Sequence, residues 1–297
     1  MRLLRRKQKA TPPENAAALR ETFDRDGLLK VDRFVDAALC DRIVAEAEEF
    51  YGRKGVQPDR AGRTMNFHQE SPAAREALSD PRLLGVLQAL LGEEPFFLQS
   101  IYFRRGSEQA PHSDYLFMST APVLQLCGVW IACEDVTEDA GPLVYYPGSH
   151  KIASIGIPER YESRIDAVRK DIDEREPELT EFYSERRMMS GESLLTCVFY
   201  DEWITELHTA LERGDYPKTV LLPQKGDCVV WHATLIHGGS PVTGGPERTR
   251  RSLVAHFLTT AVESFFDMNF VDTGNRLTLD TIDKRRPADL QVLPEAS

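Results

Sequence analysis

The spacing of apolar residues changes from helical to strand-like about a third of the way along the chain. Before Phe96, apolar positions recur three and four residues apart, which is typical of amphipathic helices. We expect helices in "AALRETFDRDGLLKV", ended by Gly27, and in "DAALCDRIVAEAEEFYG", ended by Gly52. A third helical stretch, "SPAAREALSDPRLLGVLQALLGEE", should be interrupted at "DP".

From Phe96 onward the apolar residues form short runs rich in Val, Ile, Phe, Tyr, Trp and Thr, with turn residues between them. The runs are "PFFLQSIYFRRG", "VLQLCGVWIACEDV", "GPLVYYPGSH", "SLLTCVFYD", "KTVLLPQKGDCVVWHATLIHGG" and "RRSLVAHFLTT". This pattern predicts an antiparallel sandwich or barrel. A doubly wound sheet or a TIM barrel is disfavoured, because strands and helices do not alternate regularly.

We expect a mobile basic tail over residues 1–18 and a single domain over residues 19–297. A charged, partly helical block at about 155–215 interrupts the strand pattern of this domain. An insertion of this kind either contributes to substrate specificity or decorates the surface, and the sequence favours neither reading.

Composition narrows the classes of protein to consider. A formal net charge of −11 argues against a nucleic-acid or anionic-membrane partner. No apolar run is long enough to span a bilayer, and the basic start lacks the apolar core of a signal peptide. The five cysteines are scattered and form no C-x-x-C pair, which favours a reducing cytoplasm over a disulfide framework.

Candidate metal ligands stand in "EQAPHSDYLF", where His112 and Asp114 are two residues apart. On a strand such side chains share a face, with Cα atoms about 6.5 Å apart, so both can reach one ion. Two histidines and one carboxylate are the ligand set of non-haem Fe(II) oxygenases. His237, at the end of an apolar run, is a candidate second histidine, whereas His232 would face the other side of a continuous strand. Taken singly, each residue has an ordinary structural reading.

A candidate anion site stands in "RTRRSLVAHF", where Arg250 and Ser252 share a face with Val254 and His256. A buried arginine is costly without an anion, and its planar fork binds a carboxylate through two parallel hydrogen bonds. The alternative reading is a charge at the rim, which suits Arg251.

Taken in order, these motifs resemble the phytanoyl-CoA dioxygenase family of Fe(II)/2-oxoglutarate oxygenases. The matching pieces are "HSD" at 112–114, "GVWIACEDVTEDAGPLVYYPGSHK" at 128–151, "IHGGSP" at 236–241 and "RRSLVAHF" at 250–257. The segment "DGLLKVDRFVDAALCDRI" is similar to the opening of that family. The resemblance runs from about residue 20 to about residue 260 and is interrupted by the divergent block.

The resemblance implies a mainly β fold, a double-stranded β-helix (jelly roll, cupin-like), flanked by helices. It implies Fe(II) as the metal, with 2-oxoglutarate as cosubstrate and O2 as oxidant. The implied site residues are His112, Asp114 and His237 as metal ligands, and Arg250, Ser252, Trp130 and Tyr102 as contacts of the cosubstrate.

The implied activity is oxidation of an unactivated C–H bond of a small molecule, with release of succinate and CO2. Related iron halogenases lack the carboxylate ligand, so Asp114 favours hydroxylation or a related oxidation such as desaturation. The chain departs from the family at Gly239, where a Ser or Asn often contacts the cosubstrate. Neither the substrate nor the oligomeric state is indicated by the sequence.

Two other functions remain open at this point. One is a cupin-like isomerase or binding protein without redox activity, which would not require an arginine at position 250. The other is a scaffold that has lost activity, against which the complete triad argues. We interpret His150 as a turn residue, and His68 and His208 as a loop and a helix residue without a metal role.

Overall fold

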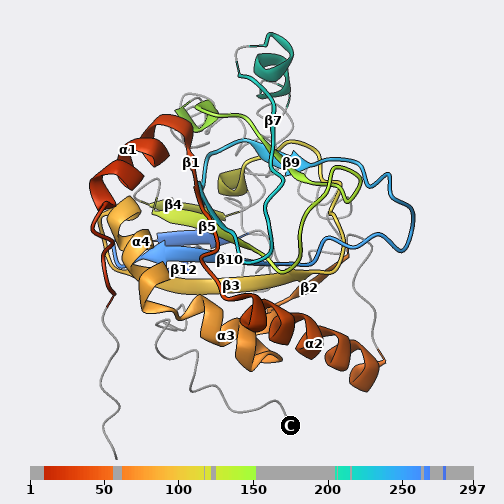
Figure 1. Ribbon diagram of the computed structural model, residues 1–297. Coiled ribbons are helices and arrows are strands. Elements are labelled where there is room, and N and C mark those ends of the chain that lie inside the picture. Colours follow the sequence, from red (N-terminus) through yellow and green to blue (C-terminus); the bar gives the residue numbers. More distant parts are fainter. Residues whose placement is uncertain are drawn as a thin grey trace, which may run out of the picture.

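The computed structural model describes residues 10–55, 62–116, 118–121, 125–151, 205, 207–214, 216–261, 264–267 and 277–278. Most of the expected insertion at about 155–215 lies outside the described residues, as does the start of the expected tail, residues 1–9. Figure 1 shows sheets at the centre, with helices α2, α3 and α4 along one side of them.

The largest sheet has six strands in the order β1-β8-β5-β10-β3-β2, and each neighbouring pair is antiparallel. Its strands are β1 Leu28–Val31, β2 Arg63–Met65, β3 Pro95–Phe103, β5 Leu126–Ala132, β8 Cys228–His232 and β10 Ser252–Thr259. Strands β5 and β10 are buried along their whole length. The sequence of β5 reads as a continuous apolar run because both of its faces are covered, whereas β10 carries the buried polar residues Ser252 and His256 among its apolar ones.

Two three-stranded sheets, β12-β11-β4 and β7-β6-β9, complete the described β-structure. Their strands are β4 Met118–Ala121, β6 Leu143–Tyr145, β7 Thr219–Val220, β9 His237–Gly239, β11 Ser264–Asp267 and β12 Leu277–Thr278. Among the described residues, three short 3-10 helices accompany them: η1 Phe67–Gln69, η2 Asp114–Leu116 and η3 Ser149–Lys151. The predicted jelly-roll class with flanking helices is confirmed, although the described strands do not close into a barrel.

Four helices supply much of the core that covers one face of the large sheet: α1 Ala16–Asp26, α2 Ala37–Lys54, α3 Pro72–Leu78 and α4 Pro81–Leu91. Helix α1 ends as predicted at Gly27, whose φ is 76°. Helix α2 passes through Gly52 and ends at Gly55, whose φ is 63°. A helical glycine costs only about 1 kcal/mol, so the packed face of α2 outweighs it. The predicted break between α3 and α4 is confirmed.

The N-terminal segment packs closer to the fold than the sequence indicated. The amide of Thr11 donates to the Pro81 carbonyl at 3.1 Å. A Cβ atom at Gly85 would lie 1.9 Å from the Thr11 carbonyl oxygen, so this glycine permits the contact. Residues 10–18 therefore belong to the folded body, and helix α1 already begins at Ala16.

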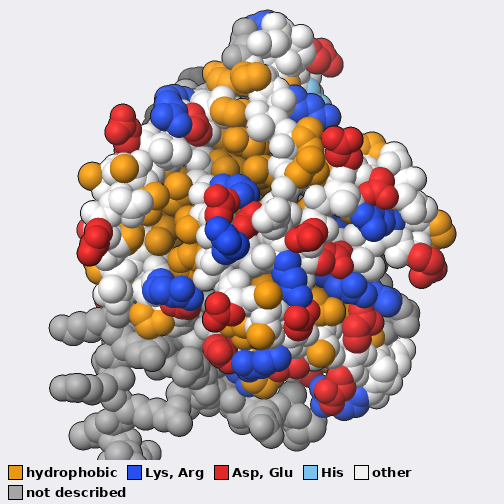
Figure 2. All heavy atoms as spheres, viewed as in Figure 1, with side chains coloured by type: hydrophobic (Ala, Val, Ile, Leu, Met, Phe, Trp, Pro, Cys, Tyr) orange, Lys and Arg blue, Asp and Glu red, His pale blue; other side chains and the backbone are white. Residues whose placement is uncertain are grey.

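Charged side chains of both signs are interspersed over the face of the molecule seen in Figure 2. In the part of the chain that the structure describes, every helix is too short or too polar to cross a bilayer.

Candidate metal centre

His112 and His237 are joined through their backbones although they lie far apart in the sequence. Each residue's amide donates to the other's carbonyl at 2.9 Å, as an isolated antiparallel bridge. The expectation of one strand through His232 and His237 is wrong. Strand β8 ends at His232, and β9 begins at His237 in a different sheet. His112 and Asp114 likewise share no regular strand, because Asp114 opens the 3-10 helix η2.

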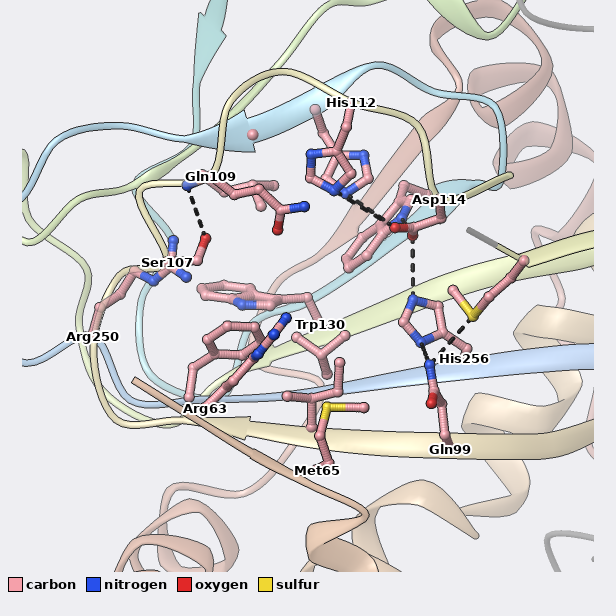
Figure 3. Close-up of a pocket in the computed structure, with 18 residues that line it drawn as sticks. Arg63, Met65, Gln99, Ser107, Gln109, His112, Asp114, Trp130, Arg250 and His256 are labelled. Carbon is pink, nitrogen blue, oxygen red and sulfur yellow. Dashed lines mark hydrogen bonds and ion pairs between the residues drawn. The ribbon is translucent and has the colours of Figure 1, made fainter. Parts of the chain in front are cut away.

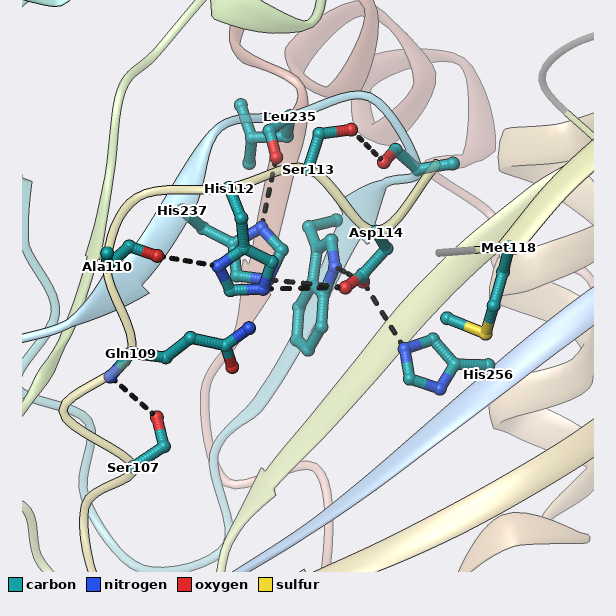
Figure 4. Close-up of polar contacts among 12 residues, drawn as sticks. Ser107, Gln109, Ala110, His112, Ser113, Asp114, Met118, Leu235, His237 and His256 are labelled. Carbon is teal, nitrogen blue, oxygen red and sulfur yellow. Dashed lines mark hydrogen bonds and ion pairs between the residues drawn. The ribbon is translucent and has the colours of Figure 1, made fainter. Parts of the chain in front are cut away.

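The side chains of His112, Asp114 and His237 converge on one point, as Figure 4 shows. One ligand atom from each lies within 4.8 Å of the others. Oδ1 of Asp114 is 3.8 Å from Nε2 of His112 and 3.7 Å from Nε2 of His237. The Nδ1 atoms of the two rings lie 2.8 Å from the Ala110 carbonyl and 3.0 Å from the Leu235 carbonyl. These bonds place the N–H on Nδ1, so the Nε2 lone pairs face Asp114.

These residues fit a divalent metal ion. All three are buried, and they form the one such cluster of three among the described residues. Burial, with His237 nearby, lowers the pKa of His112 to about 4, so its imidazole is neutral and can act as a ligand at pH 7. Ligand atoms that share one such ion lie about 3 Å from one another. Each of the three ligand atoms would therefore move by less than about 1 Å to bind a common ion. Two imidazoles and one carboxylate suit iron with open positions.

The second carboxylate oxygen of Asp114 is held by two residues that the sequence did not identify as part of the site. Oδ2 accepts a hydrogen bond from Nε1 of Trp231 at 2.7 Å and lies 3.3 Å from Nε2 of His256. Burial alone would raise the pKa of Asp114, but the hydrogen bond from His256 favours the ionised carboxylate and holds that pKa well below its usual range. The sequence did hold a signal for His256, because that residue shares a strand face with Arg250. Nothing in the sequence pointed to Trp231.

Arg250 lies in the same cavity as the three residues, a space of about 260 Å³ that Trp130 also lines (Figure 3). The Arg250 side chain is buried, and its Nη1 donates to the Gly141 carbonyl at 2.8 Å. Within the described residues, Nε of Arg250 and Nε1 of Trp130 have no hydrogen-bond partner, and no carboxylate pairs with Arg250. Burial lowers the pKa of Arg250 to about 10, which still leaves it charged at pH 7. The cavity thus offers buried donors to an anion.

Ser252 and Tyr102, the other two expected contacts of the cosubstrate, do not line the cavity. Ser252 is fully buried at the start of β10, and its Oγ has no partner within the described part of the chain, but it does not line the cavity. Tyr102 lies on the opposite face of β3 from the cavity-lining Ile101 and Phe103, with its ring 4.9 Å from that of Phe67. The structure therefore does not bring Tyr102 to the site.

The remaining histidines stand apart from this cluster. His150 lies in η3, where its Nε2 is 3.2 Å from the Asp24 carbonyl. His68 bonds through Nδ1 to Oγ of Ser100 at 2.8 Å. His208 contacts the Pro111 carbonyl through Nε2 at 3.1 Å, which joins its segment to the residue before His112.

Solved structures with the same fold include two enzymes of nogalamycin biosynthesis. The non-heme alpha-ketoglutarate-dependent epimerase SnoN shares 17% identity at a TM-score of 0.58, covering 92% of this chain and 94% of SnoN. The carbocyclase SnoK shares 15% identity at a TM-score of 0.56, covering 87% of this chain and 90% of SnoK. EctD from S. alaskensis, with 2-oxoglutarate and 5-hydroxyectoine, shares 18% identity at 0.57, covering 90% of this chain and 86% of EctD. At these identities the likeness shows the fold.

Sequence relatives match over shorter segments. Phytanoyl-CoA dioxygenase domain-containing protein 1 of Danio rerio is 33% identical over 116 residues, 34% of this chain and 40% of that protein. Its homolog in Caenorhabditis briggsae is 26% identical over 149 residues, 48% of this chain and 52% of that protein. The matches thus span about half of these relatives or less. The family model for phytanoyl-CoA dioxygenase (PhyH) matches residues 23–251, most of the chain. The chain therefore belongs to the phytanoyl-CoA dioxygenase family.

Proposed function

We propose that this protein is an Fe(II)- and 2-oxoglutarate-dependent dioxygenase that hydroxylates an unactivated C–H bond of a small molecule and releases succinate and CO2. One observation carries the proposal. A buried His-Asp-His cluster and a buried arginine without a carboxylate partner among the described residues line the same cavity. A metal site without a dicarboxylic acid has no use for that arginine, which argues against a cupin-like isomerase or binding protein.

The residues of the chain have separate tasks in this proposal. His112, Asp114 and His237 would hold the iron, and the cavity that they line would receive the cosubstrate. Bound iron supplies the oxidation of the C–H bond, coupled to decarboxylation of 2-oxoglutarate. Arg250 binds the distal carboxylate through two parallel hydrogen bonds.

The walls of the cavity position the substrate and exclude water. Trp130, 2% exposed, lies with its ring 5.9 Å from the Arg250 guanidinium carbon. Its Nε1–H is a further donor to the cosubstrate. Apolar side chains, including Met65 and Phe103, line the same cavity and provide surface for a partly apolar small molecule. Solved structures of the shared fold contain small molecules, nogalamycin RO in SnoN and 5-hydroxyectoine in EctD.

Anaerobic titration with Fe(II) and 2-oxoglutarate tests the proposal. We expect a visible charge-transfer band from the chelate, and slow succinate release when air is admitted. Asp114→Ala should lose most of its iron affinity, and Arg250→Gln should bind iron but need far more 2-oxoglutarate. Iron binding without any effect of 2-oxoglutarate would instead support the non-redox alternative. The cytoplasmic location expected from the cysteines stays a prediction.

A further inference from the structure

Four residues form one row across the large sheet beside Asp114. Trp231 on β8 is paired with Gly128 on β5, Gly128 with His256 on β10, and His256 with Gln99 on β3. The three members with side chains all line the cavity (Figure 3). A Cβ atom at Gly128 would lie 2.1 Å from Cε2 of Trp231. Glycine at this position therefore gives the indole room to reach Asp114.

The hydrogen bonds of this row converge on Asp114, one through His256 and one from Trp231. Nε2 of Gln99 lies 3.2 Å from Nδ1 of His256, and it also contacts the Met118 sulfur at 3.3 Å. Because the amide nitrogen is a donor, Nδ1 of His256 accepts and the ring proton is on Nε2. That proton points at Oδ2 of Asp114, which lies 3.3 Å from Nε2 of His256. Trp231 donates to the same oxygen at 2.7 Å, so two N–H groups occupy Oδ2.

We infer that His256, oriented by Gln99, and Trp231 are positioning residues that restrict Asp114 to binding metal through one oxygen. The inference rests on the proposed metal site. Oδ1 faces the two histidine Nε2 atoms, and the two donors direct Oδ2 away from them (Figure 4). A carboxylate that bound through both oxygens would occupy one more coordination position. Binding through one oxygen keeps three positions open, two for the chelating cosubstrate and one for O2.

Co(II) alone, added to the full chain without 2-oxoglutarate or substrate, is a suitable probe because its visible spectrum reports coordination number. We expect His256→Leu and Trp231→Phe each to weaken Co(II) binding by about 10-fold, the lower end for outer-shell partners of a metal ligand, and to alter the spectrum. His256→Gln should show the Co(II) affinity and spectrum of the wild type, because the glutamine amide keeps a donor near the position of the His256 Nε2. His68→Leu, which removes another buried histidine, is the matched control and should bind Co(II) like the wild type.

The outcomes separate this inference from the proposed function. If Asp114→Ala abolishes Co(II) binding while His256→Leu and Trp231→Phe match the wild type in affinity and spectrum, the inference is wrong and the metal site stands. If Asp114→Ala binds Co(II) unchanged, the proposed function is wrong and the inference fails with it. Should His256→Leu unfold, Trp231→Phe decides alone, since it removes the N–H and keeps an aromatic ring.

Discussion

His112 and His237 exchange two backbone hydrogen bonds of 2.9 Å, and this pairing, rather than the spacing of residues on a strand, brings their rings together. The ring centroids are 4.5 Å apart. The side chains are thus held in place by the main chain. Local changes in backbone packing around β9 should therefore weaken metal binding even where the ligands themselves are unchanged.

Gly238→Ala should impair metal binding without altering any ligand. Its Cβ would lie 2.8 Å from the Gln109 carbonyl oxygen and 3.1 Å from the Pro111 nitrogen, so the segment before His112 must move. We expect a loss of about 1–3 kcal/mol in the free energy of unfolding, typical of overpacking, and weaker Co(II) binding. Equilibrium unfolding in urea and metal titration measure these effects.

Gly52→Ala is the matched control for that change, because a Cβ at Gly52 meets nothing within 4 Å inside helix α2. It should raise the free energy of unfolding by about 0.5–1 kcal/mol and leave metal binding intact. Metal binding by Gly238→Ala equal to that of Gly52→Ala would contradict the role assigned to the β9 backbone.

Arg250→Gln should raise the KM for 2-oxoglutarate by about 30-fold or more, because it removes a buried charged partner of a carboxylate, a loss of about 2–5 kcal/mol. Arg251→Gln, the same substitution at the neighbouring arginine, is the control. Arg251 points away from the cavity and forms ion pairs with Glu134 at 3.1 Å and Glu48 at 3.5 Å. It should change stability and leave that KM unaltered. Equal KM values for the two variants, from succinate release at varied 2-oxoglutarate, would count against Arg250 as the carboxylate anchor.

Tyr102→Phe should leave the KM for 2-oxoglutarate unchanged, because Tyr102 lies on the face of β3 away from the cavity. Its hydroxyl is buried and has no hydrogen-bond partner in the described part of the chain, and burial raises the pKa of that hydroxyl. Removal of such a group should be neutral or stabilise the fold by about 1 kcal/mol. A KM increase in this variant would restore the cosubstrate contact that the sequence suggested.

Protonation of His232 should destabilise the protein in mild acid. Burial, with His150 nearby, lowers the pKa of His232 to about 4, below the ordinary value of 6.5. The unfolded chain therefore takes up a proton between pH 6.5 and pH 4 while the folded chain does not, so stability is present above pH 6.5 and falls as pH falls. In His232→Gln, the loss in the free energy of unfolding between pH 7 and pH 4.5 should be smaller by on the order of 2 kcal/mol. Urea unfolding at pH 7 and pH 4.5 measures it, and an identical slope in the variant would exclude His232 as the cause.

Much of the fold was predictable because it follows from local patterns. Helical spacing located α1 and the break between α3 and α4, where Asp80 accepts a hydrogen bond from the Arg82 amide. The β-rich runs located β3, β5 and β10. The errors arose where packing outweighs local signals, as where α2 continues past Gly52 and where residues 10–18 join the fold.

The order of the motifs named the candidate ligands and Arg250 through their resemblance to the family, and the chemistry of imidazole, carboxylate and guanidinium groups suits the roles that the resemblance implies. It could not say how they meet. The pairing of His112 with His237, the register that lines up Trp231 with His256, and the outward face of Tyr102 all depend on contacts between strands distant in sequence. Register across a sheet is set by the packing of all its strands together, so no local pattern encodes which side chains converge at one point.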